Sequence, residues 1–236
     1  MADLGQCTAA ILAGGLGTRL RSVVADRPKV MAEVRGRPFL AYLLEQLAQA
    51  GFKHTVLCTG YLGEQVKATF GDTYSSLHLE YSQESSPLGT AGALQLALPL
   101  FQSEQVLVIN GDSFCNANLI DFWAWYTDKK DAEAALLLTQ VPDTKRYGRV
   151  QVEPSGQVPK FEEKGGTEGS GWINAGIYLL ERRLLSTIPK SRAVSLETEM
   201  FPAWIGGRLY GYCSSGRFLD IGTPESYAIA DNFFSV

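Results

Sequence analysis

The strongest constraint on the fold is an alternation of short apolar runs with helical patterns through the first 130 residues. Four apolar runs are each followed by a segment of helical periodicity, in the pairs 9–13 and 39–50, 55–59 and 64–70, 79–82 and 91–98, and 105–109 and 119–129. Such an alternation is typical of β-α-β units that build a mostly parallel sheet with helices on both faces. The sequence therefore predicts a doubly wound α/β fold, with a ligand crevice at the carboxyl ends of the strands.

The segment 39–50 has the pattern of a helix that covers a sheet. Phe39, Tyr42, Leu43 and Leu47 recur at helical spacing, and polar residues occupy the opposite face. Pro38 precedes the segment and Gly51 follows it, as is usual at the two ends of a helix.

After Lys130 the pattern becomes richer in strands, which we expect at 132–141, 148–152, 157–161 and 172–180. No linker rich in Pro or Gly separates the two parts, and no repeat follows Asp220. We expect one domain over residues 1–236, with a nucleotide-binding half at about 1–130 and an acceptor half at about 131–236. The sheet should be Rossmann-like, mixed and part of three α/β/α layers.

A glycine-rich segment, LAGGLGTRL at residues 12–20, follows the first apolar run. Gly14, Gly15 and Gly17 lack Cβ atoms, so backbone N–H groups can approach an anionic ligand. The spacing matches neither of the two common nucleotide motifs, and a glycine-rich turn can also be a simple tight connection. Arg19 and Lys29, the latter after Pro28, are two cations beside the loop and indicate a polyphosphate ligand. We expect their partners to be substrate phosphates rather than groups of the protein.

Asp112 ends the apolar strand at 106–109 after the turn residues Asn110 and Gly111. A carboxylate in this place can cap a turn, but it can also hold Mg²⁺, which prefers one or two carboxylates together with phosphate oxygens and water.

Composition excludes several classes of partner. The formal net charge is −4 and no basic stripe is present, which argues against binding of nucleic acid. No stretch of about 18 apolar residues occurs, so we expect a soluble cytoplasmic protein without a membrane partner. The four cysteines are isolated from one another and have the pattern of buried free thiols. The sequence is compatible with a homo-oligomer.

Several motifs together resemble the family of sugar-1-phosphate nucleotidylyltransferases. Besides the segment at 12–20, these motifs are RPK at 27–29, LGTAGA at 88–93, NGD at 110–112, FEEK at 161–164, NAGIY at 174–178 and DIGTPE at 220–225. The resemblance runs along nearly the whole chain in the family's order, and it implies the nucleotide-diphospho-sugar transferase fold.

The resemblance also implies the roles of particular residues. The nucleotide would bind to Leu12, Ala13, Gly14, Gly15, Gly17, Thr18, Arg19, Lys29, Glu84, Leu88, Gly89, Thr90, Gly111 and Asp112. The sugar phosphate would bind to Gly148, Glu163, Lys164, Asn174 and Gly176. Mg²⁺ would bind to Asp112 and Asp220, and the catalytic residues would be Arg19, Lys29, Asp112, Lys164 and Asp220.

The implied substrates are a nucleoside triphosphate and a sugar 1-phosphate. Glu84 lies in the segment that reads the base in this family, and an ionised carboxylate suits the two adjacent donors of guanine, which favours GTP. The segments at 17–24, 37–44 and 195–202 resemble the members that use D-glycero-α-D-manno-heptose 1-phosphate. Mannose 1-phosphate with GTP and N-acetylmuramate 1-phosphate with UTP remain alternatives, as does a regulatory subunit that senses nucleotide sugars without catalysis.

Overall fold

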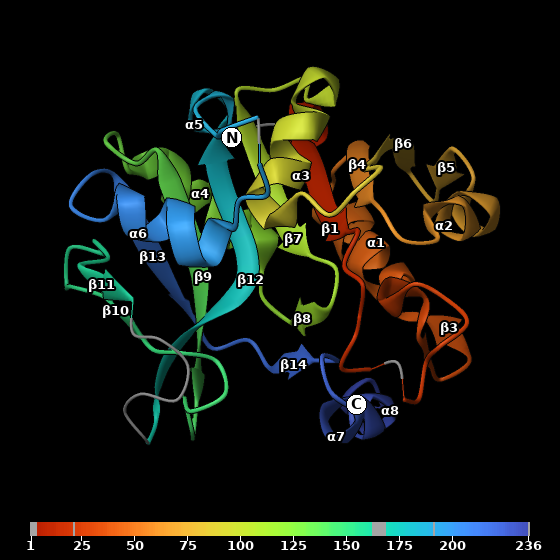
Figure 1. Cartoon of the computed structure of the whole chain (residues 1–236). Coiled ribbons are helices and arrows are strands. Elements are labelled where there is room, and N and C mark those ends of the chain that lie inside the picture. Colours follow the sequence, from red (N-terminus) through yellow and green to blue (C-terminus); the bar gives the residue numbers. More distant parts are fainter. Residues whose placement is uncertain (1–3, 21, 162–168, 191, 236) are drawn as a thin grey trace.

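A mixed sheet of eight strands forms the centre of the computed structural model, which describes residues 4–20, 22–161, 169–190 and 192–235 (Figure 1). In spatial order the strands are β13 (Leu209–Ser214), β9 (Ala134–Val141), β12 (Gly171–Glu181), β7 (Gln105–Asn110), β1 (Thr8–Ala13), β4 (His54–Thr59), β6 (Leu77–Gln83) and β5 (Thr73–Tyr74). β1 pairs in parallel with both β4 and β7, and β4 pairs in parallel with β6. β12 runs antiparallel to β7 and β9, so the sheet is mixed, as predicted.

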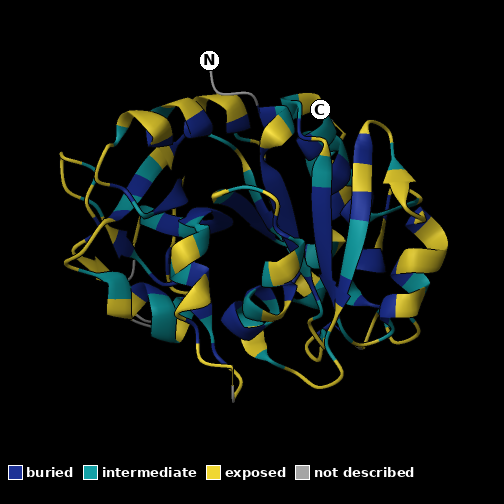
Figure 2. Ribbon diagram, turned by 90° about the horizontal axis from the view of Figure 1, so that it is seen from above, coloured by how far each residue is buried: buried dark blue, intermediate teal, exposed yellow. Residues whose placement is uncertain are grey.

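Successive side chains of each strand point to opposite faces of the sheet, and each face is covered by helices. In β7, Leu107 and Ile109 belong to one hydrophobic core, and Val106 and Val108 belong to another. The first core includes residues of α1 (Phe39–Ala50), α2 (Gly63–Phe70) and α4 (Leu119–Asp128); the second includes residues of α3 (Gly89–Ala97), α5 (Arg182–Ser186) and α6 (Phe201–Trp204). Figure 2 shows buried strands between helices whose outer surfaces are exposed, which confirms the predicted three layers.

Two-residue or three-residue strands pair at the edges of this framework. They are β2 (Glu33–Val34) with β3 (Arg37–Pro38), β8 (Ser113–Cys115) with β14 (Phe218–Asp220), and β10 (Val150–Gln151) with β11 (Lys160–Phe161). The remaining helical segments are η1 (Leu4–Gln6), η2 (Lys29–Met31), η3 (Leu98–Leu100), the π-helical turn η4 (Leu196–Met200), α7 (Pro224–Ala228) and α8 (Ala230–Phe233).

The helix predicted at 39–50 is confirmed with the same bounds. Pro38 precedes it, and Gly51 ends it in the left-handed region at φ 97°, where its N–H donates to the carbonyl oxygens of Leu47 and Ala48.

The strands predicted at 148–152 and 157–161 are shorter than expected, because only 150–151 and 160–161 pair as β10 and β11. A turn at residues 153–157 separates them; the N–H of Glu153 donates to the carbonyl of Gln157, and the N–H of Gly156 donates to the carbonyl of Glu153. Gln157 also forms an isolated bridge with Tyr210 of β13.

None of the helices in the described ranges has the length and apolar character that a membrane crossing needs.

The last helix returns to the first half of the chain. Phe234 stacks on Tyr42 of α1, with ring centroids 4.0 Å apart, and contacts Phe114 of β8 edge-on.

Candidate active site

A cleft of about 1300 Å³ opens at the carboxyl ends of the parallel strands, where the sequence predicts a ligand crevice. The loops that follow β1, β6 and β7 form one side of the cleft. Segments from residues 146–150, from the bulge of β12, from η4 and from the end of β14 form the other side. The cleft therefore lies between the two halves of the sequence.

Most of the predicted site residues lie around this one cleft. The predicted residues that line the cleft are Leu12, Gly14, Gly15, Gly17, Thr18, Arg19, Lys29, Glu84, Gly89, Thr90, Asp112, Gly148, Asn174, Gly176 and Asp220. Ala13, Leu88 and Gly111 are not among its lining residues. Glu163 and Lys164 lie outside the described residues.

Gly111 and Gly14 allow backbone and side chains to approach at the strand ends. The N–H of Gly111 donates to the carbonyl of Leu12 at 3.0 Å, and a Cβ atom on Gly111 would lie 2.6 Å from that oxygen. A Cβ on Gly14 would lie 2.9 Å from Oε1 of Glu84. Glycine at these two positions therefore lets the start of the loop after β7 lie against the end of β1 and lets the loop after β1 contact Glu84 after β6.

Gly17 brings the glycine-rich loop against Lys29. Its φ is +58°, a conformation that favours glycine, and a Cβ there would lie 3.0 Å from Cβ of Lys29. Arg19 beyond the loop is exposed, and within the described ranges it makes no hydrogen bond or ion pair. That the partner of Arg19 is a substrate phosphate stays a prediction.

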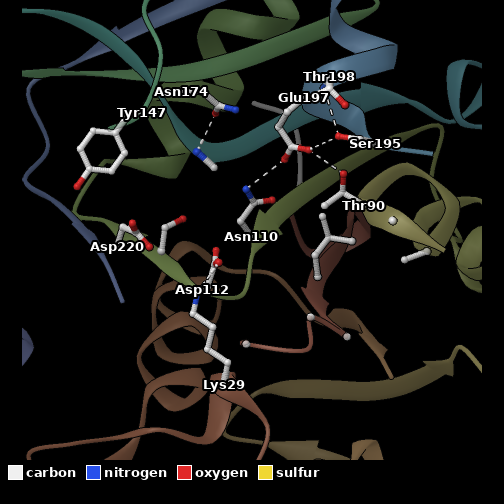
Figure 3. A pocket seen from close by; sticks show the side chains of 18 of the residues that line it. Lys29, Thr90, Asn110, Asp112, Tyr147, Asn174, Ser195, Glu197, Thr198 and Asp220 are labelled. Atoms are coloured by element: carbon white, nitrogen blue, oxygen red, sulfur yellow. Dashed lines mark hydrogen bonds and ion pairs between the residues drawn. The ribbon is translucent and has the colours of Figure 1, made fainter. Parts of the chain in front are cut away.

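For Lys29, the expectation that no group of the protein is its partner is wrong. Its side chain is 8% exposed, and Nζ forms an ion pair with Oδ2 of Asp112 at 2.7 Å (Figure 3). Lys29 begins the short helix η2 after Pro28, and this helix directs the ammonium group inward, toward the end of β7. Sequence alone could not reveal this pair, because its partners are 83 residues apart.

Asp112 and Asp220 come together because β8 and β14 pair. Asp220 lies opposite Ser113 in this pairing, and the N–H of Ile221 donates to the carbonyl of Asp112 at 2.9 Å. Asp220 also accepts the N–H of Gly222 through Oδ1, and its Oδ2 lies 3.6 Å from Nη2 of Arg146. Each carboxylate of the pair thus has a cation of the chain beside it.

The two carboxylates fit a site for Mg²⁺. Both face the cleft, and their side chains are 43% exposed at Asp112 and 18% exposed at Asp220. Within the described part of the chain no group of three or more His, Cys, Asp or Glu side chains is placed to hold a metal. Mg²⁺ does not need such a group, since it keeps several waters and takes further oxygens from substrate phosphates.

Asn174 and Gly176 lie at a bulge of β12. The register of β12 with β9 shifts between Asn174 and Tyr178, and Gly176 has a φ of +75°. Oδ1 of Asn174 accepts the N–H of Gly176 at 2.8 Å, while its Nδ2 donates to the hydroxyl of Tyr178 at 2.9 Å. The bulge aims both residues into the cleft.

Several lining residues were not predicted, among them Ser113, Arg146, Tyr147, Ser195, Glu197 and Thr198. The resemblance included residues 195–202, but that segment has no pattern by itself that distinguishes a cleft wall from a surface turn. Asn110 also lines the cleft and was predicted only as part of the turn before Asp112.

Glu84 is half-buried behind the glycine-rich loop. Its Oε2 accepts the N–H of Leu88 at 2.9 Å, which anchors the segment before α3. Burial raises the pKa of the Glu84 carboxyl, and the hydrogen bond from Leu88 opposes this rise in part.

Comparison with known proteins identifies relatives along the whole chain. The model of the nucleotidyl transferase family matches residues 8–235. The mannose-1-phosphate guanylyltransferase of Mycobacterium tuberculosis is 36% identical over 226 residues, which cover 94% of this chain and 63% of that protein. The D-glycero-alpha-D-manno-heptose 1-phosphate guanylyltransferase of Aneurinibacillus thermoaerophilus is 36% identical over 220 residues, which cover 93% of this chain and 94% of that protein.

Among solved structures, HddC from Yersinia pseudotuberculosis in complex with GMP-PN is similar, with a TM-score of 0.85 and 32% sequence identity. The match covers 97% of this chain and 100% of that chain. The predicted nucleotide-diphospho-sugar transferase fold is therefore confirmed.

The burial of Glu84 gives a prediction about stability and pH. Because the pKa of Glu84 is raised in the folded protein, the folded state holds this proton more readily than the unfolded chain, so ionisation above the folded pKa lowers stability. Glu84→Gln cannot ionise and keeps an oxygen for the N–H of Leu88. We measure the free energy of unfolding of both proteins with urea. The value for Glu84→Gln minus the value for the parent should increase as the pH rises from about 4 to about 7.5. A difference that shrinks as the pH rises would contradict this account.

Proposed function

Because this chain belongs to the nucleotidyl transferase family, we propose that it transfers a guanylyl group from GTP to a sugar 1-phosphate and releases pyrophosphate. The main support is that one cleft brings together the glycine-rich loop, Arg19, Lys29 and the carboxylates of Asp112 and Asp220. Two relatives that are 36% identical to this chain are guanylyltransferases.

The reaction proposed is a single in-line displacement. A phosphate oxygen of the sugar 1-phosphate attacks the α-phosphorus of GTP, and the bond from that phosphorus to the oxygen of the β-phosphate breaks. The electron pair of the broken bond leaves with pyrophosphate. The second pKa of a phosphate monoester is about 6, so the attacking group is mostly a dianion at neutral pH and requires no general base. Catalysis is then a matter of positioning and charge neutralisation.

Different residues of the cleft would position the substrates and neutralise their charge. The N–H groups of the loop around Gly15 and the guanidinium of Arg19 would bind the triphosphate. Lys29 reaches the same region from η2. Asp112 and Asp220 would hold Mg²⁺, which when bound neutralises phosphate charge.

The sugar phosphate would lie on the other side of the cleft. Gly148, Asn174 and Gly176 line that side. We propose, on the resemblance to the family, that Lys164 neutralises the phosphate of the acceptor and that Glu163 accepts hydrogen bonds from the sugar hydroxyls. A protein that only senses nucleotide sugars would not require the paired carboxylates, which favours catalysis.

The assignment of guanine rests on Glu84. Its carboxylate lines the cleft and can only accept hydrogen bonds when ionised, which suits the two adjacent donors on the edge of guanine. Uracil and thymine present a donor flanked by acceptors, which a carboxylate would match less well. The bound GMP-PN in the similar HddC structure agrees with a nucleotide of this base.

For the acceptor we propose a sugar 1-phosphate of manno configuration, with D-glycero-α-D-manno-heptose 1-phosphate as the first candidate. Heptose 1-phosphate guanylyltransferases from two bacteria are 36% and 35% identical to this chain. Mannose 1-phosphate is the second candidate, because the enzyme of Mycobacterium tuberculosis has the same identity of 36%.

A screen of substrate pairs tests this proposal. Pyrophosphate release is measured with the four common nucleoside triphosphates, each against the 1-phosphates of the heptose, mannose, glucose and N-acetylmuramate. We expect GTP with the heptose 1-phosphate to give the highest kcat/KM. Preference for mannose 1-phosphate would move the sugar assignment to the second candidate, and preference for UTP or dTTP would refute guanylyl transfer.

The carboxylate of Asp112 should be needed for turnover. Asp112→Asn keeps the shape of the side chain but removes its charge, and the loss of one preorganised electrostatic group lowers kcat by about 10²-fold to 10³-fold. We expect a loss of this size in kcat with Mg²⁺ saturating, while circular dichroism stays that of the parent. Asp128→Asn, an exposed position at the end of α4, is the matched control. Activity of Asp112→Asn within a few-fold of the parent would remove Asp112 from the metal site.

Substitution of Glu84 should change the choice of base. In Glu84→Gln one accepting oxygen becomes a donor that faces the donors of guanine, and an unpaired buried polar group costs about 1–3 kcal/mol. We expect kcat/KM for GTP to fall at least about tenfold relative to kcat/KM for UTP, which corresponds to about 1.4 kcal/mol. An unchanged ratio of the two values would mean that Glu84 does not contact the base.

A further inference from the structure

Glu197 is a carboxylate in the cleft to which the proposed reaction gives no role. It lies in the π-helical turn Leu196–Met200, and its side chain extends between Thr90 and Asn110 (Figure 3). Turns of this type are uncommon and occur often at functional sites.

The side chain of Glu197 accepts hydrogen bonds from four donors. Oε2 accepts from the hydroxyl of Thr90 at 2.7 Å and from that of Ser195 at 3.1 Å. Oε1 accepts from the hydroxyl of Tyr178 at 3.3 Å and from Nδ2 of Asn110 at 3.4 Å. Four donors around two oxygens match an ionised carboxylate, which only accepts.

On one side, hydrogen bonds join this network to the start of α3, which lies on the proposed nucleotide side of the cleft. The hydroxyl oxygen of Thr90 accepts the N–H of Leu196 at 2.8 Å while its proton is directed to Glu197. The N–H of Val194 donates to the carbonyl of Leu88 at 2.8 Å, and the carbonyl of Val194 accepts the N–H of Ala91 at 3.0 Å. The segment that carries Glu197 is therefore bound to the first turn of α3.

The other side is tied to the bulge of β12. Tyr178 is fully buried, and burial raises the pKa of its hydroxyl well above the usual value, so the hydroxyl keeps its proton as a donor. With that proton directed to Glu197, the hydroxyl oxygen accepts Nδ2 of Asn110 at 3.1 Å and Nδ2 of Asn174 at 2.9 Å. The amide of Asn174 then presents its oxygen to the N–H of Gly176.

Glu197 sets the direction of the hydrogen bonds from the hydroxyls of Thr90, Ser195 and Tyr178. The backbone N–H groups of Leu196 and Gly176 can only donate, so their bonds do not depend on Glu197. If the side chain here carried a donor, one of the four neighbouring donors would have to turn away or lose its partner. Reversal of the Tyr178 hydroxyl would leave an amide N–H of Asn110 or Asn174 without an acceptor. Glu197 thus orients the Tyr178 hydroxyl that accepts Nδ2 of Asn174, while the N–H of Gly176 holds the oxygen of the same amide.

We propose that Glu197 is a positioning residue that fixes the sugar-phosphate side of the cleft relative to the nucleotide side. The inference rests on the proposed function, because the two sides must hold the attacking oxygen and the α-phosphorus in line. A displacement of about 1 Å between reacting groups can lower the rate about 10²-fold without removing any contact to substrate. Glu197 acts through Thr90, Tyr178 and Asn174, and none of the proposed chemistry occurs at its own atoms.

The test compares Glu197→Gln with the parent and with Glu199→Gln. Glu199 lies in the same turn, pairs with exposed Arg192, accepts the N–H of Ser195 at 3.0 Å and is not among the residues that line the cleft. Glu199→Gln keeps an oxygen for that N–H, so it tests whether a loss of charge in the turn is enough to lower kcat. For Glu197→Gln we expect kcat to fall at least tenfold while both KM values and the Kd for GTP stay within about threefold. Glu199→Gln should keep the kcat of the parent. A kcat of Glu197→Gln within threefold of the parent, or an equal loss in Glu199→Gln, would overturn the proposal.

A second variant and a double-mutant cycle distinguish loss of the network from misfolding. Tyr178→Phe keeps the buried ring and removes the hydroxyl that joins Glu197 to both amides. If the residues act as one unit, the double variant should lose no more in kcat than the more damaged single variant. Losses that multiply would show independent roles and would refute the network.

A spectroscopic measurement separates this inference from the proposed function. Side-chain amide signals of Asn110 and Asn174, assigned in ¹⁵N-labelled protein without substrate, should exchange slowly with water in the parent and rapidly in Glu197→Gln. If the parent turns over no pair of substrates, the proposed function fails while this measurement still tests the network. Unchanged exchange at both amides in Glu197→Gln would refute it.

Discussion

The pairing of β1 with β4 on one side and with β7 on the other determines where a ligand can bind in this protein. From β1 the chain continues outward through β4 and β6, and it then returns to place β7 on the other side of β1. The loops after β1 and β7 therefore diverge at the carboxyl edge of the sheet. At that edge the strands are still within hydrogen-bond distance, so the first loop residues must be small. Gly14 and Gly111 meet this requirement, because a Cβ on Gly14 would lie within 3 Å of Oε1 of Glu84 and a Cβ on Gly111 would lie within 3 Å of the carbonyl oxygen of Leu12 in β1.

The charges at this edge are compensated within the chain. Lys29 lies against Asp112, and Arg146 lies beside Asp220, so each carboxylate proposed to hold Mg²⁺ has a cationic neighbour. Lys29 is almost completely buried, and an unpaired buried charge would cost several kcal/mol, whereas the more exposed Arg146 pair contributes little to stability. The protein thus holds its binding groups in place with interactions that a substrate and a metal would exchange for their own.

Local patterns in the sequence predicted the elements whose form depends on neighbouring residues. The helix at 39–50 with Pro38 and Gly51 at its ends, the alternation that builds the parallel strands, and the glycine-rich loop all belong to this class. The ion pair of Lys29, the pairing of β8 with β14 and the contacts of Glu197 with Thr90 and Asn110 join residues about 80 to 110 positions apart, and nothing in the local pattern specifies them. The strands expected at 148–152 and 157–161 are shorter in the structure, and the bridge between Gln157 and Tyr210 is another contact that the local pattern does not specify.

The aromatic contacts of the last helix have a consequence for the order in which the molecule forms during synthesis. Phe233 and Phe234 pack on Phe114, and Phe234 also stacks on Tyr42, so residues near the end of the chain cover a surface built by its first half. Asp220 reaches the cleft only a few residues earlier. A ribosome extends a chain from its N-terminus at about 5–20 residues per second, and contacts of high sequence separation form slowly. The nascent chain therefore exposes an apolar surface and an incomplete cleft until residues 220–234 have emerged, and this one segment supplies both the aromatic cover and Asp220, the second carboxylate that we propose to hold Mg²⁺.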